Sequence, residues 1–256
     1  MILTNRSNVG RVRHVNEDNA WTEKWSDTVA LAIVADGMGG HLAGDVASQL
    51  AVQAFSKIMQ ESIHHPSITV DEGKMLMRQA ITEANRQIYQ LASSDERYYQ
   101  MGTTIVAAIV CNNEIIIGHV GDSRAYLFSK ETITSLTSDH TLVNELVKSG
   151  QLTEEEAAVH KRRNILSRAV GTDEFVEIDI QSFPWSTNDI LLLCSDGLTN
   201  MVSEAEMQQT IAAHHLSLDE KANEFIRLAL TAGGDDNITV ALIENSLDGQ
   251  REERAK

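Results

Sequence analysis

The stretch LAIVADGMGG, residues 31–40, joins an apolar run to an Asp-Gly pair. Residues 29–35 are all apolar, which predicts a buried strand that ends at Asp36-Gly37. The stretch LLLCSDGL, residues 191–198, repeats this arrangement with Asp196-Gly197. Asp-Gly after a strand is a common turn, because glycine adopts positive φ and aspartate bonds to its own backbone. Each motif alone therefore indicates a turn, and only their combination suggests a site.

The rest of the chain shows clusters of strands and pairs of helices. Apolar residues recur in steps of four and three from Met77 to Leu91, which predicts an amphipathic helix, and a similar face runs from Val46 to Ile58. Further helices are expected at residues 203–213 and 218–230, and the sequence TEEE at 153–156 has capping-box spacing. Strands are expected at residues 103–111, 115–120, 124–129, 133–136, 175–181, 190–194 and 237–244. This grouping favours an α+β sandwich over regular βαβ alternation.

Composition and charge exclude several classes of protein. No apolar run approaches the ~18 residues of a membrane span, and no N-terminal apolar segment resembles a signal peptide. The 21 Lys and Arg against 37 Asp and Glu give a net charge of −16, which disfavours nucleic acid and anionic membranes as partners. Cys111 and Cys194 lie in apolar runs and are expected as reduced core thiols. A cytoplasmic protein is therefore expected.

Acidic residues gather in turns beside the predicted strands. Besides the two Asp-Gly motifs these are Asp122 in HVGDSRAY, Asp235-Asp236 in GGDDNITV and Glu17-Asp18 near the N-terminus. If these carboxylates share one cleft, each pair at ~4 Å costs roughly 4 kcal/mol at an effective dielectric near 20. A bound divalent cation would reverse that cost. Oxygen ligands without a His or Cys cluster select Mg²⁺, Mn²⁺ or Ca²⁺ over zinc, and two such ions can clamp a phosphoryl group.

Other phosphate and hydrolytic chemistries lack their motifs. A cysteine phosphatase needs Cys-x5-Arg, but the sixth residues after Cys111 and Cys194 are Ile117 and Asn200. The chain contains no G-x-x-x-x-G-K-[ST], H-E-x-x-H or G-x-G-x-x-G motif and no G-x-S-x-G elbow. A carboxylate-bound metal is therefore the chemistry that the sequence favours.

The order of these motifs resembles the protein phosphatase 2C family of metal-dependent protein phosphatases, in its compact bacterial form. The resemblance runs from about residue 4 to residue 243 and rests on GRVRHVNEDN, VADGMGGH, MGTT, HVGDSRAY, LTSDHT, LSRAVG, LLLCSDGL and GGDDNITV. It implies a four-layer α/β/β/α sandwich, with two central antiparallel sheets flanked by helices. It also implies a single phosphatase domain at 1–246, a flap at about 139–165, and a charged C-terminal tail at 247–256.

The resemblance further implies roles for individual acidic residues. Asp36 resembles the carboxylate that bridges two metals, and the Gly37 carbonyl would bind one of them. Asp196 and Asp236 resemble the remaining ligands of the second metal, and Asp236 is preferred to its neighbour because Asn237 follows it, as in the family's Asp-Asn motif. The other implied roles are outer residues that hold metal-bound waters at Glu17 and Asp18, and a third-metal site at Asp122 with Asp196.

Phosphate binding and proton donation involve other side chains. Arg13 resembles the residue that grips the substrate phosphate, and a guanidinium can fork onto two phosphate oxygens. Met38 stands where better-known eukaryotic relatives carry a histidine proposed as the general acid, and a thioether cannot donate a proton. The general acid is then either His41, three residues on, or a water on the third metal. His119 and His140 lie inside family motifs and are expected to pack or to form hydrogen bonds.

Lys161, Arg162 and Arg163 form the only compact basic cluster of the chain. Such a cluster is either a solvated run of charge or, in the expected flap, a contact for a phosphoprotein substrate.

The expected function is hydrolysis of phosphoserine and phosphothreonine by direct attack of a hydroxide that bridges two Mn²⁺ or Mg²⁺ ions, with a third ion as an option. Phosphorylated proteins and a bacterial Ser/Thr protein kinase are the expected partners of a monomeric enzyme. Two alternatives stay open. One is a phosphoprotein-binding module without activity, which would bind phosphopeptide and release no phosphate. The other is a metallophosphoesterase for small phosphorylated metabolites.

Overall fold

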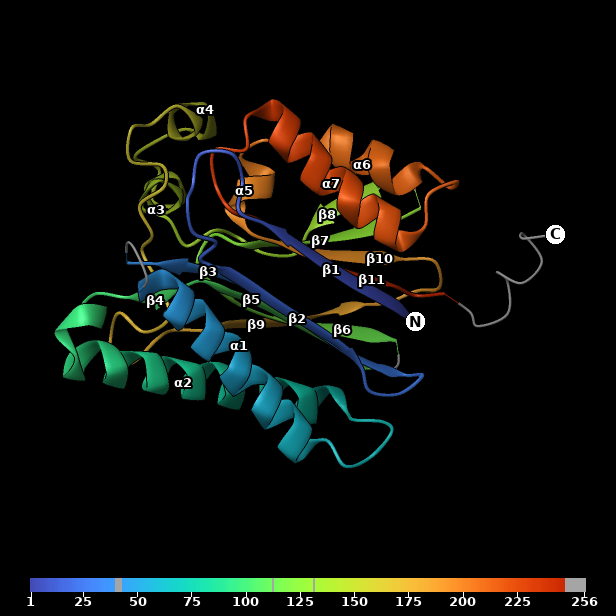
Figure 1. The fold of residues 1–256 in the computed structure, drawn as a ribbon. Helices are drawn as coiled ribbons and strands as arrows, with labels where there is room; N and C mark the ends of the chain where they lie inside the picture. Colours follow the sequence, from blue (N-terminus) through green and yellow to red (C-terminus); the bar gives the residue numbers. More distant parts are fainter. Residues whose placement is uncertain (40–42, 112, 131, 247–256) are drawn as a thin grey trace.

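Two antiparallel sheets pack face to face and carry helices on both outer faces (Figure 1). The computed structural model describes residues 1–39, 43–111, 113–130 and 132–246. One sheet has the strand order β1-β11-β10-β7-β8, and the other has the order β2-β3-β5-β6-β9, with β4 paired to β3. The expected α+β sandwich of four layers is confirmed. The charged tail expected at 247–256 lies outside the described residues.

The bounds of the elements are as follows. The first sheet contains β1 (Ile2–Asn8), β7 (Arg124–Ser129), β8 (Thr132–Ser135), β10 (Ile190–Cys194) and β11 (Ile238–Glu244). The second contains β2 (Asp18–Lys24), β3 (Val29–Met38), β4 (Gly102–Thr103), β5 (Ile105–Cys111), β6 (Glu114–Val120) and β9 (Asp179–Pro184). The helices are α1 (Ala43–Ser62), α2 (Val70–Ser94), η1 (Glu96–Tyr98), α3 (Leu142–Lys148), α4 (Glu154–Ala158), α5 (Asp196–Thr199), α6 (Glu204–Ala212) and α7 (Leu218–Ala232).

The continuous apolar run at the start of β3 reflects burial on both faces of its sheet. Leu31 and Ile33 pack toward α1 and α2, whereas Ala32 and Val34 face the other sheet. A strand with one wet face would alternate apolar and polar residues, so the run marks a layer covered on both sides. The α6 and α7 helices cover the outer face of the first sheet.

Helix prediction from periodicity agrees closely with the structure. The core face predicted from Met77 to Leu91 is buried as far as Ile88, and Leu91 packs against the core partly buried. The capping box expected at Thr153 is present at the start of α4. Within the described ranges, no helix is long and apolar enough to cross a membrane.

Two strands were not predicted, and two others differ from their predicted bounds. The sequence did not predict β1 or β2, because both are edge strands whose half-exposed residues are largely polar. The strand expected at 175–181 lies instead at β9, and Phe175 is 84% exposed before it. The strand expected at 103–111 breaks at Thr104, whose backbone N–H donates to the Asp36 carbonyl (2.8 Å).

Candidate active site

Asp36 lies near the end of β3, where two threonines fix its backbone. Its carbonyl accepts hydrogen bonds from Thr103 Oγ1 and from the backbone N–H of Thr104, both at 2.8 Å. Its own N–H donates to Thr104 Oγ1 (3.1 Å). The sequence predicted a strand that ends at Asp36-Gly37, and β3 continues one residue further, to Met38, because β4 pairs with it. The aspartate is therefore held by a rigid strand end, which suits precise placement of a ligand.

Two glycines beside the acidic residues allow very close backbone approach. A Cβ at Gly37 would lie 2.1 Å from the Gly44 carbonyl oxygen, and a Cβ at Gly197 would lie 1.9 Å from the Asn237 carbonyl oxygen. Only glycine fits at either position. Both Asp-Gly motifs are thus required by close backbone packing, with the nearby start of α1 at Gly37 and with the distant residue Asn237 at Gly197, in addition to any local turn.

Asp196 begins α5 directly after β10, and its surroundings link it to Asp18. Asn200 Nδ2 donates to Asp196 Oδ2 (3.0 Å). The preceding residue, Ser195, donates its hydroxyl to Asp18 Oδ2 (2.7 Å) within the core. Asp18 lies opposite Asp36 in the register of β2 and β3. Two sheets therefore bring three acidic residues from distant parts of the sequence to one end of the sandwich.

Most of the acidic residues singled out from the sequence line one cavity of 580 Å³. These are Glu17, Asp36, Asp122, Asp196 and Asp236, and Gly37 and Arg13 lie on the same walls. Asp18 is buried behind them. His41 lies outside the described residues. The structure thus brings together residues whose motifs are separated by up to about 220 positions.

Burial and mutual repulsion disfavour negative charge on these carboxylates. Burial, and then the charges of Asp18 and Asp196, raise the pKa of Asp36 well above its usual range. Burial, followed by the charge of Asp196, raises the pKa of Asp122 to about 7. Burial, followed by the charge of Asp236, also raises the pKa of Asp196. A cation placed among them would remove most of this penalty.

The donors fit a hard divalent cation in type and charge. They are carboxylates with one backbone carbonyl, the set that Mg²⁺ and Mn²⁺ prefer. Asp18 Oδ1 is buried and has no hydrogen-bond partner among the described residues, which suits a carboxylate that orients bound water. In the described part of the chain, no three His, Cys, Asp or Glu side chains are arranged to enclose an ion as they stand. These residues therefore fit a divalent ion by the type of their donor atoms.

Asp18→Asn should stabilise the metal-free protein at pH 8 but not at pH 4. Burial raises the folded-state pKa of Asp18 from 3.8 to about 7, so the folded state retains a proton that the unfolded chain releases. Wild-type stability then falls as pH rises from about 4 to about 7, by up to about 1.4 kcal/mol per pH unit. Denaturant unfolding in EDTA across this range measures the effect. A variant-minus-wild-type difference that is constant with pH would contradict it.

Arg13 reaches the cavity from a loop at 9–17 that a buried asparagine closes. Arg13 Nη2 donates to Asp236 Oδ2 (2.8 Å), and both side chains are partly exposed. Asn237 donates from Nδ2 to the carbonyls of Val9 (2.9 Å) and Val15 (3.0 Å), and its Oδ1 accepts from the backbone N–H of Glu17 (2.8 Å). One amide therefore ties both ends of the loop that carries Arg13. In the sequence, Asn237 served only to distinguish Asp236 from Asp235 as the expected ligand.

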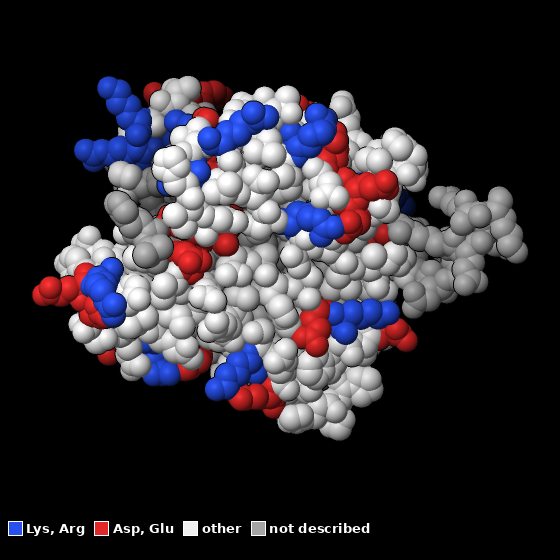
Figure 2. Space-filling model, viewed as in Figure 1, with Lys and Arg blue, Asp and Glu red and all other residues white. Residues whose placement is uncertain are grey.

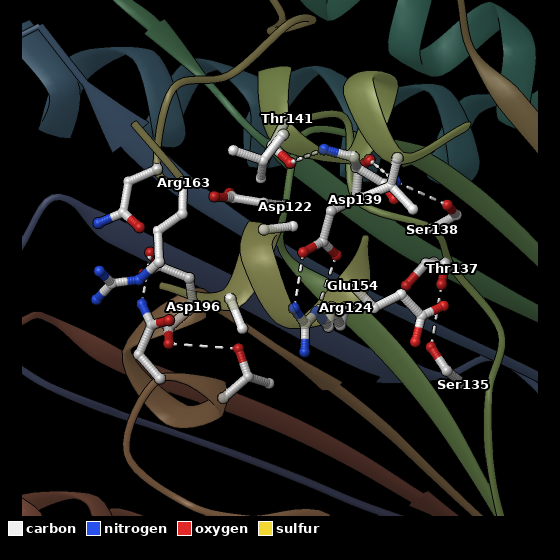
Figure 3. A pocket seen from close by; sticks show the side chains of 18 of the residues that line it. Asp122, Arg124, Ser135, Thr137, Ser138, Asp139, Thr141, Glu154, Arg163 and Asp196 are labelled. Carbon is white, nitrogen blue, oxygen red and sulfur yellow. Dashed lines mark hydrogen bonds and ion pairs between the residues drawn. The ribbon is translucent and has the colours of Figure 1, made fainter. Parts of the chain in front are cut away.

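A second cavity of 410 Å³ adjoins the first and shares Asp122, Asp196 and Asn164 with it (Figure 3). The figure shows these aspartates apart from the ion pair of Arg124 and Asp139, which is bidentate at 2.8 and 2.7 Å. Helices α3 and α4 form one wall, and both lie within the range expected for the flap.

The three residues of the basic cluster lie on two different surfaces. Arg163 lines the second cavity, whereas Lys161 and Arg162 line a separate surface hollow with the exposed Val159. Figure 2 shows basic side chains gathered at this end of the molecule, over the region of α4, while acidic and basic groups are interspersed elsewhere on the visible face. Of the three residues, only Arg163 therefore lines the cavity that adjoins the carboxylate site.

Arg168 is a second cation on the wall of the 580 Å³ cavity, to which the sequence had assigned no role. Its Nη1 donates to Asp179 Oδ1 (3.1 Å), and its Nη2 lies 3.1 Å from Glu177 Oε2. The motif LSRAVG contained this arginine, but the residue that it pairs with could not be read from the sequence.

Comparison with known proteins gives one consistent result. Residues 10–231 match the family Protein phosphatase 2C. The Serine/threonine phosphatase stp of Listeria welshimeri is 47% identical over 242 residues, which cover 94% of this chain and 95% of the relative. The S. agalactiae serine/threonine phosphatase structure has a TM-score of 0.86 at 41% identity and covers 94% of this chain and 98% of that one. The catalytic domain of serine threonine protein phosphatase PstP, in complex with 2 manganese ions, has a TM-score of 0.80 at 33% identity and covers 94% and 96%.

Proposed function

This chain belongs to the protein phosphatase 2C family and is a protein serine/threonine phosphatase, and on that premise we propose which residues perform the reaction. One observation carries the proposal: carboxylates from separate strand ends converge on a cavity that also receives a guanidinium. Such a site matches hydrolysis of a phosphate monoester, which needs charge neutralisation and orientation of the phosphoryl group.

The carboxylates supply the metal site in this proposal. Asp36 and the Gly37 carbonyl, with Asp196 and Asp236, would hold two ions of Mn²⁺ or Mg²⁺, and Asp122 with Asp196 would hold a third. When bound, these ions supply an activated water for direct attack on phosphorus and neutralise charge on the phosphoryl oxygens. Glu17 and Asp18 orient water at the rim and the back of the site. The manganese complex of the related PstP catalytic domain supports the choice of metal.

The remaining roles belong to cationic and proton-donating groups. Arg13 orients the substrate phosphate, since its guanidinium already lies beside Asp236 at the mouth of the cavity. Met38 lines the cavity and cannot donate a proton to the leaving alkoxide. The general acid would be His41 or, when the third ion is bound, a water that this ion supplies. Hydrolysis proceeds directly, without a phosphoenzyme.

The cellular setting follows from the reaction class. We propose a single phosphatase domain at 1–246 that acts as a monomer on phosphorylated proteins and opposes a Ser/Thr protein kinase. Cys111 and Cys194 are free and buried, which suits the reducing cytoplasm.

Turnover of a phosphothreonine peptide, compared with that of small phosphorylated metabolites such as sugar phosphates, tests the substrate class. A kcat/KM for the peptide at least about tenfold higher is expected, because the peptide also contacts the second cavity and the flap. Faster turnover of a metabolite would favour the small-molecule phosphoesterase. Peptide binding without release of phosphate would favour the binding module.

Replacing Lys161, Arg162 and Arg163 by alanine should lower kcat/KM for a phosphoprotein roughly 5- to 10-fold and leave p-nitrophenyl phosphate turnover unchanged. The cluster lies outside the cavity that holds the reacting groups, so only a large substrate reaches it. Arg163→Ala alone should account for most of the effect, because Arg163 lines the adjoining cavity. An equal loss of kcat/KM on both substrates would contradict a role of the cluster in binding phosphoproteins.

A further inference from the structure

Asp122 lies on a short loop between β6 and β7 that packs against residues from two other segments. The loop consists of Gly121, Asp122 and Ser123, and Ser123 is fully buried. Gly121 has φ +112°, and a Cβ there would lie 2.6 Å from Thr104 Cγ2. The loop is thus part of the packed interior, and Asp122 extends from it into the cavity shared with Asp36 and Asp196.

Thr104 holds this loop from the side of Asp36. Its Oγ1 accepts the backbone N–H of Asp36 (3.1 Å) and lies 2.7 Å from Ser123 Oγ. A threonine hydroxyl can accept one hydrogen bond and donate another, so it can satisfy both partners at once. Thr104 is 2% exposed, so water does not compete for these bonds. A single hydroxyl therefore connects the backbone of Asp36 to the residue that follows Asp122.

His140 holds the same loop through hydrogen bonds to the backbone of Gly121. Its Nδ1 accepts the backbone N–H of Gly121 (3.1 Å), and its own backbone N–H donates to the Gly121 carbonyl (2.7 Å). An accepting Nδ1 places the ring proton on Nε2, which faces Asp179 Oδ2 at 3.4 Å. The ring also stacks on His119 with centroids 4.6 Å apart. Burial lowers the pKa of His140, which keeps the ring neutral and Nδ1 able to accept.

These bonds oppose a specific force. Asp122 and Asp196 line the same two cavities, and like charges on these carboxylates repel each other, so a loop without these bonds would move Asp122 away from Asp196. Ion binding would then have to order the loop again, at a cost in affinity.

We propose that Thr104 and His140 are positioning residues that hold Asp122 at a fixed separation from Asp36, and thereby set the affinity for the divalent ion held by Asp122 and Asp196. The inference rests on the proposed function in taking Asp122 as a metal ligand.

Calorimetric titration of the metal-free protein with Mn²⁺, in a buffer without phosphate, tests the inference. The difference in Mn²⁺ binding between wild type and Asp122→Asn identifies the binding step of the ion that Asp122 holds. Thr104→Val keeps the shape of the side chain and removes the hydroxyl, and His140→Leu removes the acceptor. Each variant should lower the affinity for that ion roughly 10- to 100-fold. His140→Asn retains an acceptor at the position of Nδ1, so its affinity for the ion should fall by less than about threefold. Thr210→Val, which removes a buried hydroxyl bonded within α6, should leave Mn²⁺ binding unchanged.

A second set of variants separates positioning from general damage. In the Asp122→Asn background, Thr104→Val and His140→Leu should cause no further loss of Mn²⁺ affinity. Equal losses in both backgrounds, wild-type affinity in both single variants, or unchanged binding in Asp122→Asn would each overturn the inference. If thermal unfolding shows that Thr104→Val is not folded, Ser123→Ala serves in its place, because it removes the partner hydroxyl.

Phosphate release from a phosphothreonine peptide, recorded for wild type in the same samples, keeps the two proposals apart. Absence of release with the expected Mn²⁺ effects would refute the function and leave the positioning role standing. Release with unaltered Mn²⁺ binding in the variants would refute the positioning role alone.

Discussion

Asp36→Asn should reduce metal-dependent phosphate release by at least roughly 100-fold, while the metal-free protein becomes more stable. Asparagine keeps the shape of the side chain but removes the charge that a bridging ligand must supply. Burial and neighbouring aspartates raise the pKa of Asp36 well above its usual range, so its ionised form destabilises the folded state above the unfolded pKa. Removing that charge therefore stabilises the fold at neutral and alkaline pH. Phosphate release with Mn²⁺ and thermal unfolding in EDTA at pH 8 measure the two effects.

Asp235→Asn is the matched control for this substitution. Asp235 is an exposed neighbour of Asp236 in the same motif and does not line the cavity. Its replacement should change activity by no more than about twofold, as for most surface substitutions. If Asp36→Asn retained full Mn²⁺-dependent activity, Asp36 would not be the central ligand. If it lowered both activity and metal-free stability, the substitution would have damaged the fold instead of the charge cluster.

Asn237→Ala should destabilise the protein by about 3 kcal/mol and lower kcat/KM roughly 100-fold. The side chain is 5% exposed and makes three hydrogen bonds to backbone groups, each of which would lose its partner. Those bonds close the loop that carries Arg13, so the guanidinium would no longer be held against the substrate phosphate. Denaturant unfolding and steady-state kinetics on a phosphothreonine peptide measure the two losses.

Asn85→Ala provides a comparison with the same number of lost bonds. Asn85 accepts from the Gly171 N–H (2.7 Å) and donates to the carbonyls of Asp173 (3.0 Å) and Glu174 (3.1 Å). It should lose similar stability but much less activity, because it does not touch the Arg13 loop. In an Arg13→Ala background, Asn237→Ala should still lower stability but cost little further activity. Full additivity of the activity losses would show that Asn237 acts independently of Arg13.

The sequence predicted the elements whose burial is continuous or periodic. Both faces of β3 and one face of α2 are buried, so their apolar patterns are complete. The edge strands β1 and β2 alternate only weakly and were missed, although Asp18 begins β2. Convergence of the acidic motifs followed from the family resemblance, since spacing along the chain does not place two sheets relative to each other.

The residues that hold the site together were harder to predict. Thr104, His140 and Asn237 act through backbone atoms of partners far away in the sequence, and no local pattern encodes such contacts. The basic cluster was expected either as a solvated run of charge or as a substrate contact, and the structure divides it: Arg163 lines the second cavity, whereas Lys161 and Arg162 line a separate hollow. Motifs thus indicated which residues carry charge, while tertiary packing decides which of them face the site.

Phosphate release by the wild-type protein from a phosphothreonine peptide, first in EDTA and then with Mn²⁺ or Mg²⁺ restored, tests the central claim most directly. We expect no release in EDTA and full recovery with the added ion, because the carboxylates that line the cavity would repel a phosphoryl group unless a divalent ion offsets their charge. Release that continues in EDTA, or no release with any divalent ion, would contradict it.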